Sequence, residues 1–146
     1  MSGVTANRSA PWARIVPVLA VADVPRAAAW YVSVLDLVEH VRVGAGHRVQ
    51  LGFDGERAEL IVREFRDGEH ASDSTDQVMI RVDDVDGVLE AARSHGADTA
   101  DAARTFPYGE RQAGFVDPFG HEWVLTQTMS DVDPDEWGGE TVVARR

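Results

Sequence analysis

Residues 117–123, DPFGHEW, place a histidine beside a glutamate where an expected turn meets an expected strand. A histidine and a carboxylate could bind a metal ion or act as an acid/base pair. Adjacent strand residues point to opposite faces, so His121 and Glu122 cannot both face one ligand. Asp, Pro and Gly at the first, second and fourth positions favour a type I turn, in which Asp117 bonds the backbone two residues on. We interpret the stretch first as structural; a catalytic His121 and a domain or dimer contact stay open.

The composition limits the classes of partner. With 146 residues, one domain is expected, and 14 basic against 25 acidic residues give a net charge of −11. This charge argues against nucleic-acid binding and favours neutral or cationic partners. There is no cysteine, which excludes disulfides and thiolate chemistry. No stretch approaches the roughly 18 apolar residues of a membrane span, and the start does not resemble a signal peptide. We expect a cytoplasmic protein with no membrane partner.

The chain repeats one pattern of elements. A Val/Ile/Leu-rich strand over residues 14–22 leads into Asp23, which can cap the helix that follows. Residues 47–53 and 57–65 then alternate apolar and polar side chains around a DGE hairpin turn. Strand, capping Asp84 and helix return in the same order, and a shift of 61 residues aligns residues 16–24 with 77–85. The sequence therefore predicts two strand–helix–strand–strand–strand units.

These patterns predict the domain organisation. We expect a flexible arm over residues 1–13 and a single domain over 14–129, with its two modules at 14–66 and 76–129. Residues 130–146 form an acidic extension, and Trp137 suggests that part of it docks on the domain.

The duplicated unit, the helix phrase AAAWYVSVLDL and the segment YGERQAGFVDPFGHEW resemble the vicinal-oxygen-chelate superfamily, also called the glyoxalase/bleomycin resistance/dioxygenase superfamily. YGER followed by DPFGHEW looks most like its PhnB-like branch. The resemblance spans roughly residues 15–133. It implies an α+β fold in which paired βαβββ modules form a curved mixed sheet around a cavity, usually in a homodimer.

Enzymes of this superfamily usually hold a divalent metal on four inward residues. Carried over by position, these are Val16, Glu59, Gln77 and Val124. Valine has no lone pair, and one carboxylate with one amide is too small a ligand set for tight binding. The five histidines show no paired ligand spacing. We therefore predict no metal and no other cofactor, with Glu59 and Gln77 as vestigial positions, unless the alignment is shifted in register.

Strand alternation predicts the faces that line the cavity. In residues 77–82, the apolar positions 78, 80 and 82 should pack on the helices, while 77, 79 and 81 face the cavity. By the same rule positions 60 and 62 face the helices, and 59, 61 and 63 the cavity. A buried Glu59 needs a partner, which could be Arg63, Arg81 or a ligand.

Aromatic residues suggest where a flat ligand could stack. Phe106, Tyr108 and Arg111 lie in TFPYGERQ, a segment that borders the cavity mouth in the family, whereas Trp123 should face the helices. The predicted ligand-binding set combines these residues with the cavity-facing strand positions: Val16, Val18, Phe53, Glu59, Ile61, Arg63, Gln77, Met79, Phe106, Tyr108, Arg111 and Val124.

Missing metal ligands favour a binding protein over an enzyme. We expect a metal-free member of the family that sequesters an aromatic or cationic compound, such as an antibiotic, without catalytic residues. The alternative is a metal-dependent lyase, epimerase or dioxygenase. A third reading is an assembly or regulatory protein that uses the dimer surface and the acidic tail.

Overall fold

The computed structural model describes residues 13–56, 58–71 and 75–142, so most of the expected N-terminal arm lies outside the described residues. The first module contains β1 (Val18–Val21), α1 (Val24–Leu35), β2 (Val38–Val43), the 3-10 turn η1 (Gly44–Gly46), β3 (Arg48–Gly52) and β4 (Glu59–Glu64). The second contains β5 (Gln77–Arg81), α2 (Val85–Ser94), β6 (Arg104–Thr105), β7 (Glu110–Val116) and β8 (Glu122–Thr128), followed by the 3-10 turn η3 (Pro134–Trp137).

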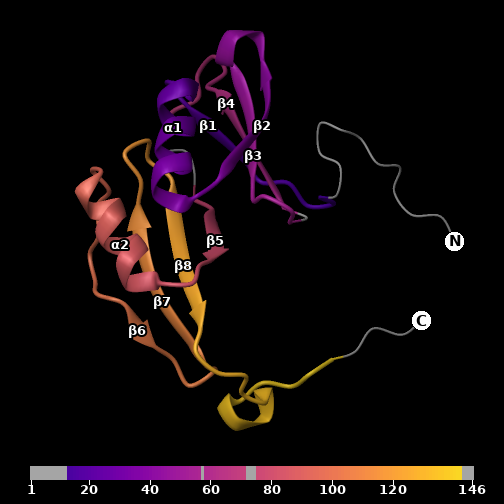
Figure 1. Ribbon diagram of the computed structural model, residues 1–146, viewed down its shortest axis with the longest axis vertical. Helices are drawn as coiled ribbons and strands as arrows, with labels where there is room; N and C mark the ends of the chain where they lie inside the picture. Colours follow the sequence, from indigo (N-terminus) through magenta and orange to yellow (C-terminus); the bar gives the residue numbers. More distant parts are fainter. Residues whose placement is uncertain (1–12, 57, 72–74, 143–146) are drawn as a thin grey trace, which may run out of the picture.

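Each module forms its own four-stranded mixed sheet (Figure 1). The strand orders are β1-β4-β3-β2 and β5-β8-β7-β6, here called sheet A and sheet B. In both sheets the first and last strands of the module pair in parallel, while the hairpin strands pair antiparallel. The predicted α+β fold of two βαβββ modules is therefore confirmed.

The repeat extends to the helix starts. The Asp23 side chain accepts a hydrogen bond from the Arg26 backbone N–H at 3.1 Å, and Asp84 accepts one from Gly87 at 3.1 Å. An N-terminal cap of this kind satisfies one of the backbone donors that the first helical turn leaves unpaired. Both predicted caps are confirmed.

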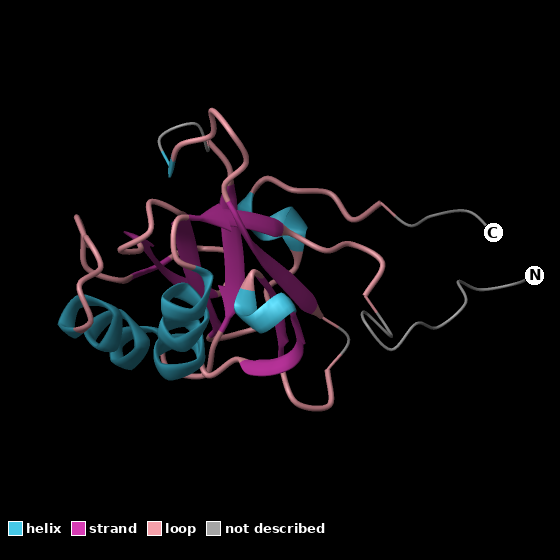
Figure 2. Cartoon of the chain, turned by 90° about the horizontal axis from the view of Figure 1, so that it is seen from above, coloured by secondary structure: helices cyan, strands magenta, loops and turns pink. Residues whose placement is uncertain are grey.

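Both helices lie on one side of the sheets (Figure 2). The indole N–H of Trp30 on α1 donates to the His95 carbonyl at the end of α2, 2.7 Å away, and ties the helices together. The core lies between helices and sheets, and Leu60, Val62 and Trp123 are buried there. The other face of each sheet is only partly open: Met79 and Arg81 are exposed there, whereas Gln50, Glu59 and Thr126 are buried.

The DPFG segment forms the predicted turn. The Gly120 N–H donates to the Asp117 carbonyl at 3.1 Å, and the Asp117 carboxylate accepts from the Phe119 and His121 backbone N–H groups at 2.9 Å each. The same carboxylate also accepts from the Trp123 indole at 2.9 Å and from the Tyr31 hydroxyl at 2.5 Å. Asp117 therefore fastens the turn, β8 and α1 to one another.

The histidine of this stretch connects the two modules. His121 is buried, and its Nε2 lies 2.6 Å from the Ala20 carbonyl of β1, to which it must donate. This contact agrees with the structural interpretation of the stretch and with the alternative that His121 makes a domain contact.

Among the described residues, no helix combines the length and apolar character needed to cross a bilayer.

Candidate functional site

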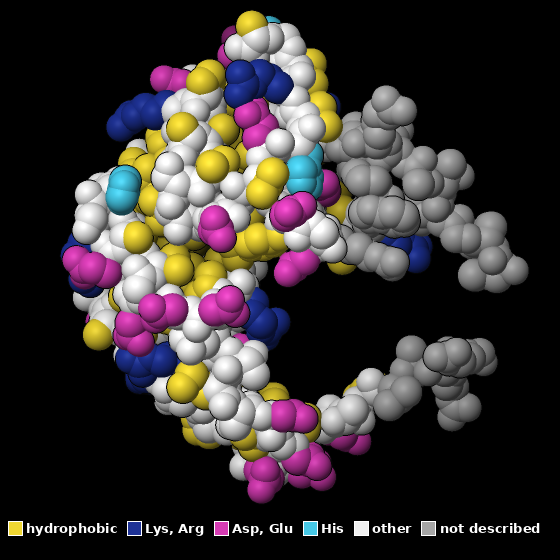
Figure 3. All heavy atoms as spheres, viewed as in Figure 1, with side chains coloured by type: hydrophobic (Ala, Val, Ile, Leu, Met, Phe, Trp, Pro, Cys, Tyr) yellow, Lys and Arg dark blue, Asp and Glu magenta, His cyan; other side chains and the backbone are white. Residues whose placement is uncertain are grey.

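The two sheets curve away from the helices and leave a hollow between the modules, seen from the side in Figure 3. The lower wall of this hollow is the open face of sheet B. Side chains at alternate positions of β5, β7 and β8 face it, because neighbouring strand residues point to opposite faces.

One end of this wall carries an aromatic cluster, here called the aromatic rim: Phe106, Tyr108 and Trp137. The Phe106 and Tyr108 rings are stacked, with centroids 5.2 Å apart and planes 10° apart, and Trp137 meets Tyr108 at 5.5 Å. The guanidinium of Arg104 lies over the Phe106 ring at 4.4 Å. A tight turn holds the rim, because the Gly109 N–H donates to the Phe106 carbonyl at 3.0 Å.

The contact of Trp137 with Tyr108 shows that η3, in the acidic extension, docks on the second module.

A chain of hydrogen bonds runs from the aromatic rim across the wall. The Tyr108 hydroxyl donates to Gln112 Oε1 at 2.8 Å, and the Gln112 amide donates to Thr126 Oγ1 at 3.1 Å. The Thr126 hydroxyl in turn donates to Glu110 Oε1 at 2.6 Å. Each member is thereby held in one orientation before any ligand arrives.

Glu110 is the charged end of this chain. The hydroxyls of Thr126 and Thr128, and then Arg81, lower the pKa of the Glu110 carboxyl below its ordinary value by hydrogen bonding to its ionised form. Arg81 bonds Glu110 at 3.0 Å and Thr128 at 3.0 Å. The wall therefore presents an ionised carboxylate that is already paired with a guanidinium.

A cavity of about 710 Å³ lies over this part of sheet B. Its lining includes Arg104, Phe106, Gln112, Gly114 and Val124. The volume falls in the range of small-molecule sites, about 300–1,000 Å³. Aromatic surface, a guanidinium and a side-chain amide suit it for recognising a flat ligand; the arrangement offers stacking and orientation.

The structure distributes the predicted binding residues over three cavities. Phe106 and Val124 line the sheet B cavity, with Tyr108 beside it. A second cavity of about 240 Å³ at the junction of the modules is lined by Phe53, Glu59 and Met79, and a third of about 180 Å³ on sheet A by Val18 and Arg63. The remaining cavity-facing positions lie outside these linings: Val16, Ile61 and Gln77.

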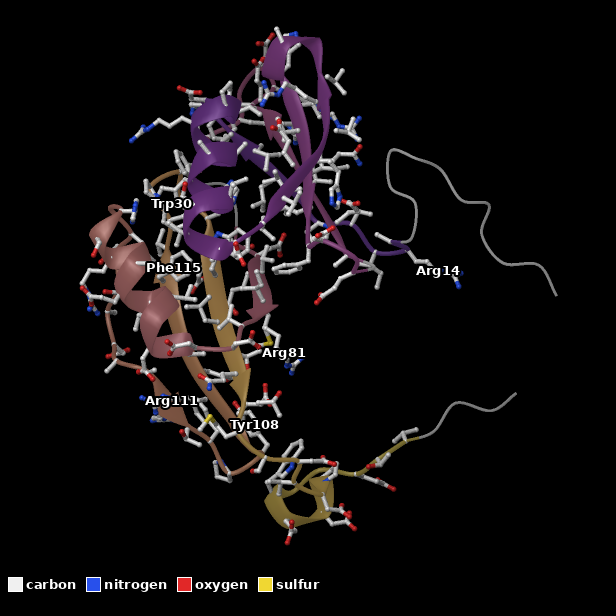
Figure 4. All side chains as sticks on the ribbon, viewed as in Figure 1. Arg14, Trp30, Arg81, Tyr108, Arg111 and Phe115 are labelled. Atoms are coloured by element: carbon white, nitrogen blue, oxygen red, sulfur yellow. The ribbon has the colours of Figure 1, made fainter. Side chains whose placement is uncertain are left out.

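Arg111 does not point into the hollow. Its guanidinium bonds both oxygens of Asp86 on α2, each at 2.9 Å, on the helix side of sheet B. Figure 4 shows it on the opposite side of β7 from the hollow, into which Arg81 projects. The prediction that Arg111 joins Phe106 and Tyr108 is wrong, because Arg111 shares the face of the buried Ala113 and Phe115.

The predicted internal partners of Glu59 are also wrong. Arg63 bonds Glu69 at 2.7 Å and Arg81 bonds Glu110, whereas Glu59 meets His40 of β2 at 2.9 Å. The bulge in β2 between Glu39 and Val41 interrupts regular pairing beside His40. The sequence does not display this irregularity.

Four residues of the sheet B wall are absent from the set predicted from sequence: Arg104, Glu110, Gln112 and Thr126. The alternation of side chains along a strand could have placed three of them on the wall. Gln112 and Glu110 lie two and four positions from Gly114 on β7, and Thr126 lies two positions from Val124 on β8.

The four metal positions of the superfamily do not fit a divalent ion in this chain. Val16 and Val124 have no donor atom, and Oε1 of Glu59 is engaged by His40. No three His, Asp or Glu side chains converge as ligands in the part of the chain that the structure describes. These four positions therefore lack the donor set that a divalent ion needs.

Comparison with known proteins agrees with this architecture. TioX from Micromonospora sp. ML1 has a TM-score of 0.62 at 29% identity, covering 78% of this chain and 97% of that one. TnmS3, an antibiotic binding protein from Streptomyces sp. CB03234, has a TM-score of 0.60 at 23% identity, covering 77% and 93%. The latter likeness establishes the fold alone.

Curated relatives match a shorter segment. An uncharacterized protein of Mycobacterium bovis is 36% identical over 59 residues, which span 40% of this chain and 39% of that protein. An uncharacterized protein of Mycobacterium tuberculosis is also 36% identical over 59 residues, which span 35% of that protein. The sequence model of the Glyoxalase/Bleomycin resistance protein/Dioxygenase superfamily matches residues 13–125. The chain belongs to this superfamily.

Proposed function

We propose that this protein binds a flat aromatic or cationic small molecule, such as an antibiotic, over sheet B without a metal and without converting it. The observation that carries the proposal is the stacked pair Phe106–Tyr108 beside a cavity of about 710 Å³. Small-molecule sites are typically apolar and aromatic surfaces with a few placed polar groups. The lining here combines Phe106, Val124 and small residues with the polar side chains of Asp101, Arg104 and Gln112.

In the aromatic rim, the planar guanidinium of Arg104 lies on an aromatic ring. Arg104 covers one face of Phe106 at 4.4 Å, so this face is suited to a planar, positively charged group. A ligand of that kind could take the place of the guanidinium. The net charge of −11 would speed the approach of such a cation, and salt would screen the effect.

The superfamily includes enzymes, so a metal-dependent lyase, epimerase or dioxygenase is the competing function. The donor set supports binding over that alternative, because two of the four metal positions are valines. TnmS3, which shares the fold, is an antibiotic binding protein, so the fold accommodates a binding function. Elemental analysis decides between the two: about one equivalent of zinc, nickel, iron or manganese, lost in Glu59→Ala, would support the enzyme.

The Tyr108→Ala variant tests the binding site. Screening aromatic and cationic compounds by tryptophan fluorescence should yield a ligand with Kd below about 100 μM, and Tyr108→Ala should weaken it about tenfold, or 1.4 kcal/mol. The loss arises because half of the stacked pair and the first link to Gln112 disappear together. Tyr108→Phe keeps the ring and should lose less.

Two outcomes would contradict the proposal. One is a library without any ligand in this range. The other is a compound that metal-free protein converts into product, which liquid chromatography of the incubated mixture would detect.

The open faces of the sheets support a homodimer. Val18 is 51% exposed on sheet A and Met79 is 59% exposed on sheet B. A second copy could cover them. Light scattering should then give twice the chain mass of 15.9 kDa at micromolar concentration, and a monomer mass would argue against pairing.

We also propose that the chain belongs to the PhnB-like branch and acts in the cytoplasm. YGER and DPFGHEW support the branch, and the absence of cysteine is compatible with a reducing compartment. Fractionation of the source cells would test the location.

A further inference from the structure

The junction cavity between the modules contains a buried acidic group that the proposed ligand site does not use. The cavity has a volume of about 240 Å³ and shares no lining residue with the cavity over sheet B. Its walls are apolar, with Phe53, Leu60, Val78 and Met79 among them. Among the described residues of this lining, Glu59 is the one that carries a charged group.

Only one oxygen of Glu59 is satisfied by the described residues. Its side chain is 4% exposed, and Oε1 lies 2.9 Å from His40 Nδ1. Oε2 is buried and has no hydrogen-bond partner among the described residues. Buried carboxylate oxygens are normally paired, since an unpaired one loses its hydration without compensation. An N–H donor from a ligand would complete the set.

Gly52 makes the space for this arrangement. It pairs with Glu59 across β3 and β4. A Cβ at Gly52 would lie 2.5 Å from the Ala58 carbonyl oxygen, 2.9 Å from His40 Cε1 and 3.1 Å from Glu59 Oε2. Glycine weakens a strand, so its presence here marks a close approach. Gly52 and Glu59 both line the cavity.

We propose that the junction cavity binds a primary ammonium group carried on a small apolar body, with the ammonium donating to Glu59 Oε2. The apolar walls would bury the body of the ligand, and the cation would offset the carboxylate charge. One carboxylate is the right complement for one ammonium. It is too small a ligand set for a divalent ion.

The probe is benzylamine, which is protonated at pH 7.5, with benzyl alcohol as its uncharged counterpart of similar shape. Isothermal titration calorimetry should show the amine binding at least about tenfold more tightly than the alcohol. Glu59→Gln keeps the shape of the side chain and removes its charge, so it should abolish this preference.

Glu64→Gln is the matched control. Glu64 lies on the same strand and also meets a histidine, His47, at 3.3 Å, but its side chain is 55% exposed. A non-specific attraction of a cation to an acidic protein would respond to both variants equally. The proposal requires that Glu64→Gln leave the preference intact.

Three affinity results would each overturn the proposal: equal affinity of the amine and the alcohol for the unaltered protein, a preference that survives in Glu59→Gln, or a preference lost equally in Glu64→Gln. The first comparison needs no variant, so it decides even where Glu59→Gln fails to fold. Binding at the junction must also shift the methyl resonance of Met79, which lines the cavity. Binding without that shift would place the amine elsewhere and refute the site.

Discussion

Replacing Asp117 with alanine should lower the free energy of unfolding by about 4 kcal/mol, because buried donors left unpaired cost about 1–3 kcal/mol each. The carboxylate accepts from two side chains, Tyr31 and Trp123, and from two backbone N–H groups. Burial, followed by the charge of Asp117, raises the pKa of the Tyr31 hydroxyl well above its ordinary value, so it remains a donor. Urea denaturation followed by circular dichroism measures the change.

Two further variants serve as comparisons for Asp117→Ala. Asp117→Asn keeps one acceptor oxygen but turns an amide toward the Tyr31 and Trp123 donors, so we expect an intermediate loss of about 2 kcal/mol. Asp131→Ala removes an exposed carboxylate beyond β8 and should change stability by no more than about 0.5 kcal/mol. If Asp117→Ala costs less than about 1 kcal/mol, the hydrogen bonds of DPFGHEW do not explain its role, and a functional one must be sought.

The second large effect concerns the cavity over sheet B. Gly114→Leu should weaken binding of the fluorescence-screen ligand by more than about tenfold. Gly114 lies on the open face of β7 and lines this cavity, so a leucine side chain would occupy the space that the ligand needs. Titration of the variant with that ligand, followed by tryptophan fluorescence, measures the loss.

The fold should tolerate this substitution. A Cβ at Gly114 would meet only the Trp123 carbonyl oxygen, at an ordinary 3.6 Å, and side chains generally suit a strand better than glycine does. We therefore expect the free energy of unfolding of Gly114→Leu to lie within about 1 kcal/mol of that of the unaltered protein. Gly114→Ala, with its smaller side chain, should reduce affinity less. Unchanged affinity in a folded Gly114→Leu variant would show that the ligand binds elsewhere.

The sequence predicted those features that depend on neighbouring residues. The caps at Asp23 and Asp84, the DPFG turn and the burial of Trp123 on the helix side follow from local hydrogen bonding and strand alternation. The repeat of 61 residues was visible because both modules use the same order of elements. Phe106 and Tyr108 were predicted to stack on a flat ligand; in the structure their rings stack on each other.

Tertiary structure decided the partners and faces of the charged side chains. Arg111 pairs with Asp86, 25 positions earlier, because its strand face is set by the pairing of β7 with β8, and a shift of one residue would have reversed it. Glu59 meets His40 because the hairpin of β2 and β3 brings the histidine beside the space left at Gly52. Charge pairs form between residues that the folded chain brings close, so residue type and local spacing could indicate that Glu59 needed a partner but could not identify it.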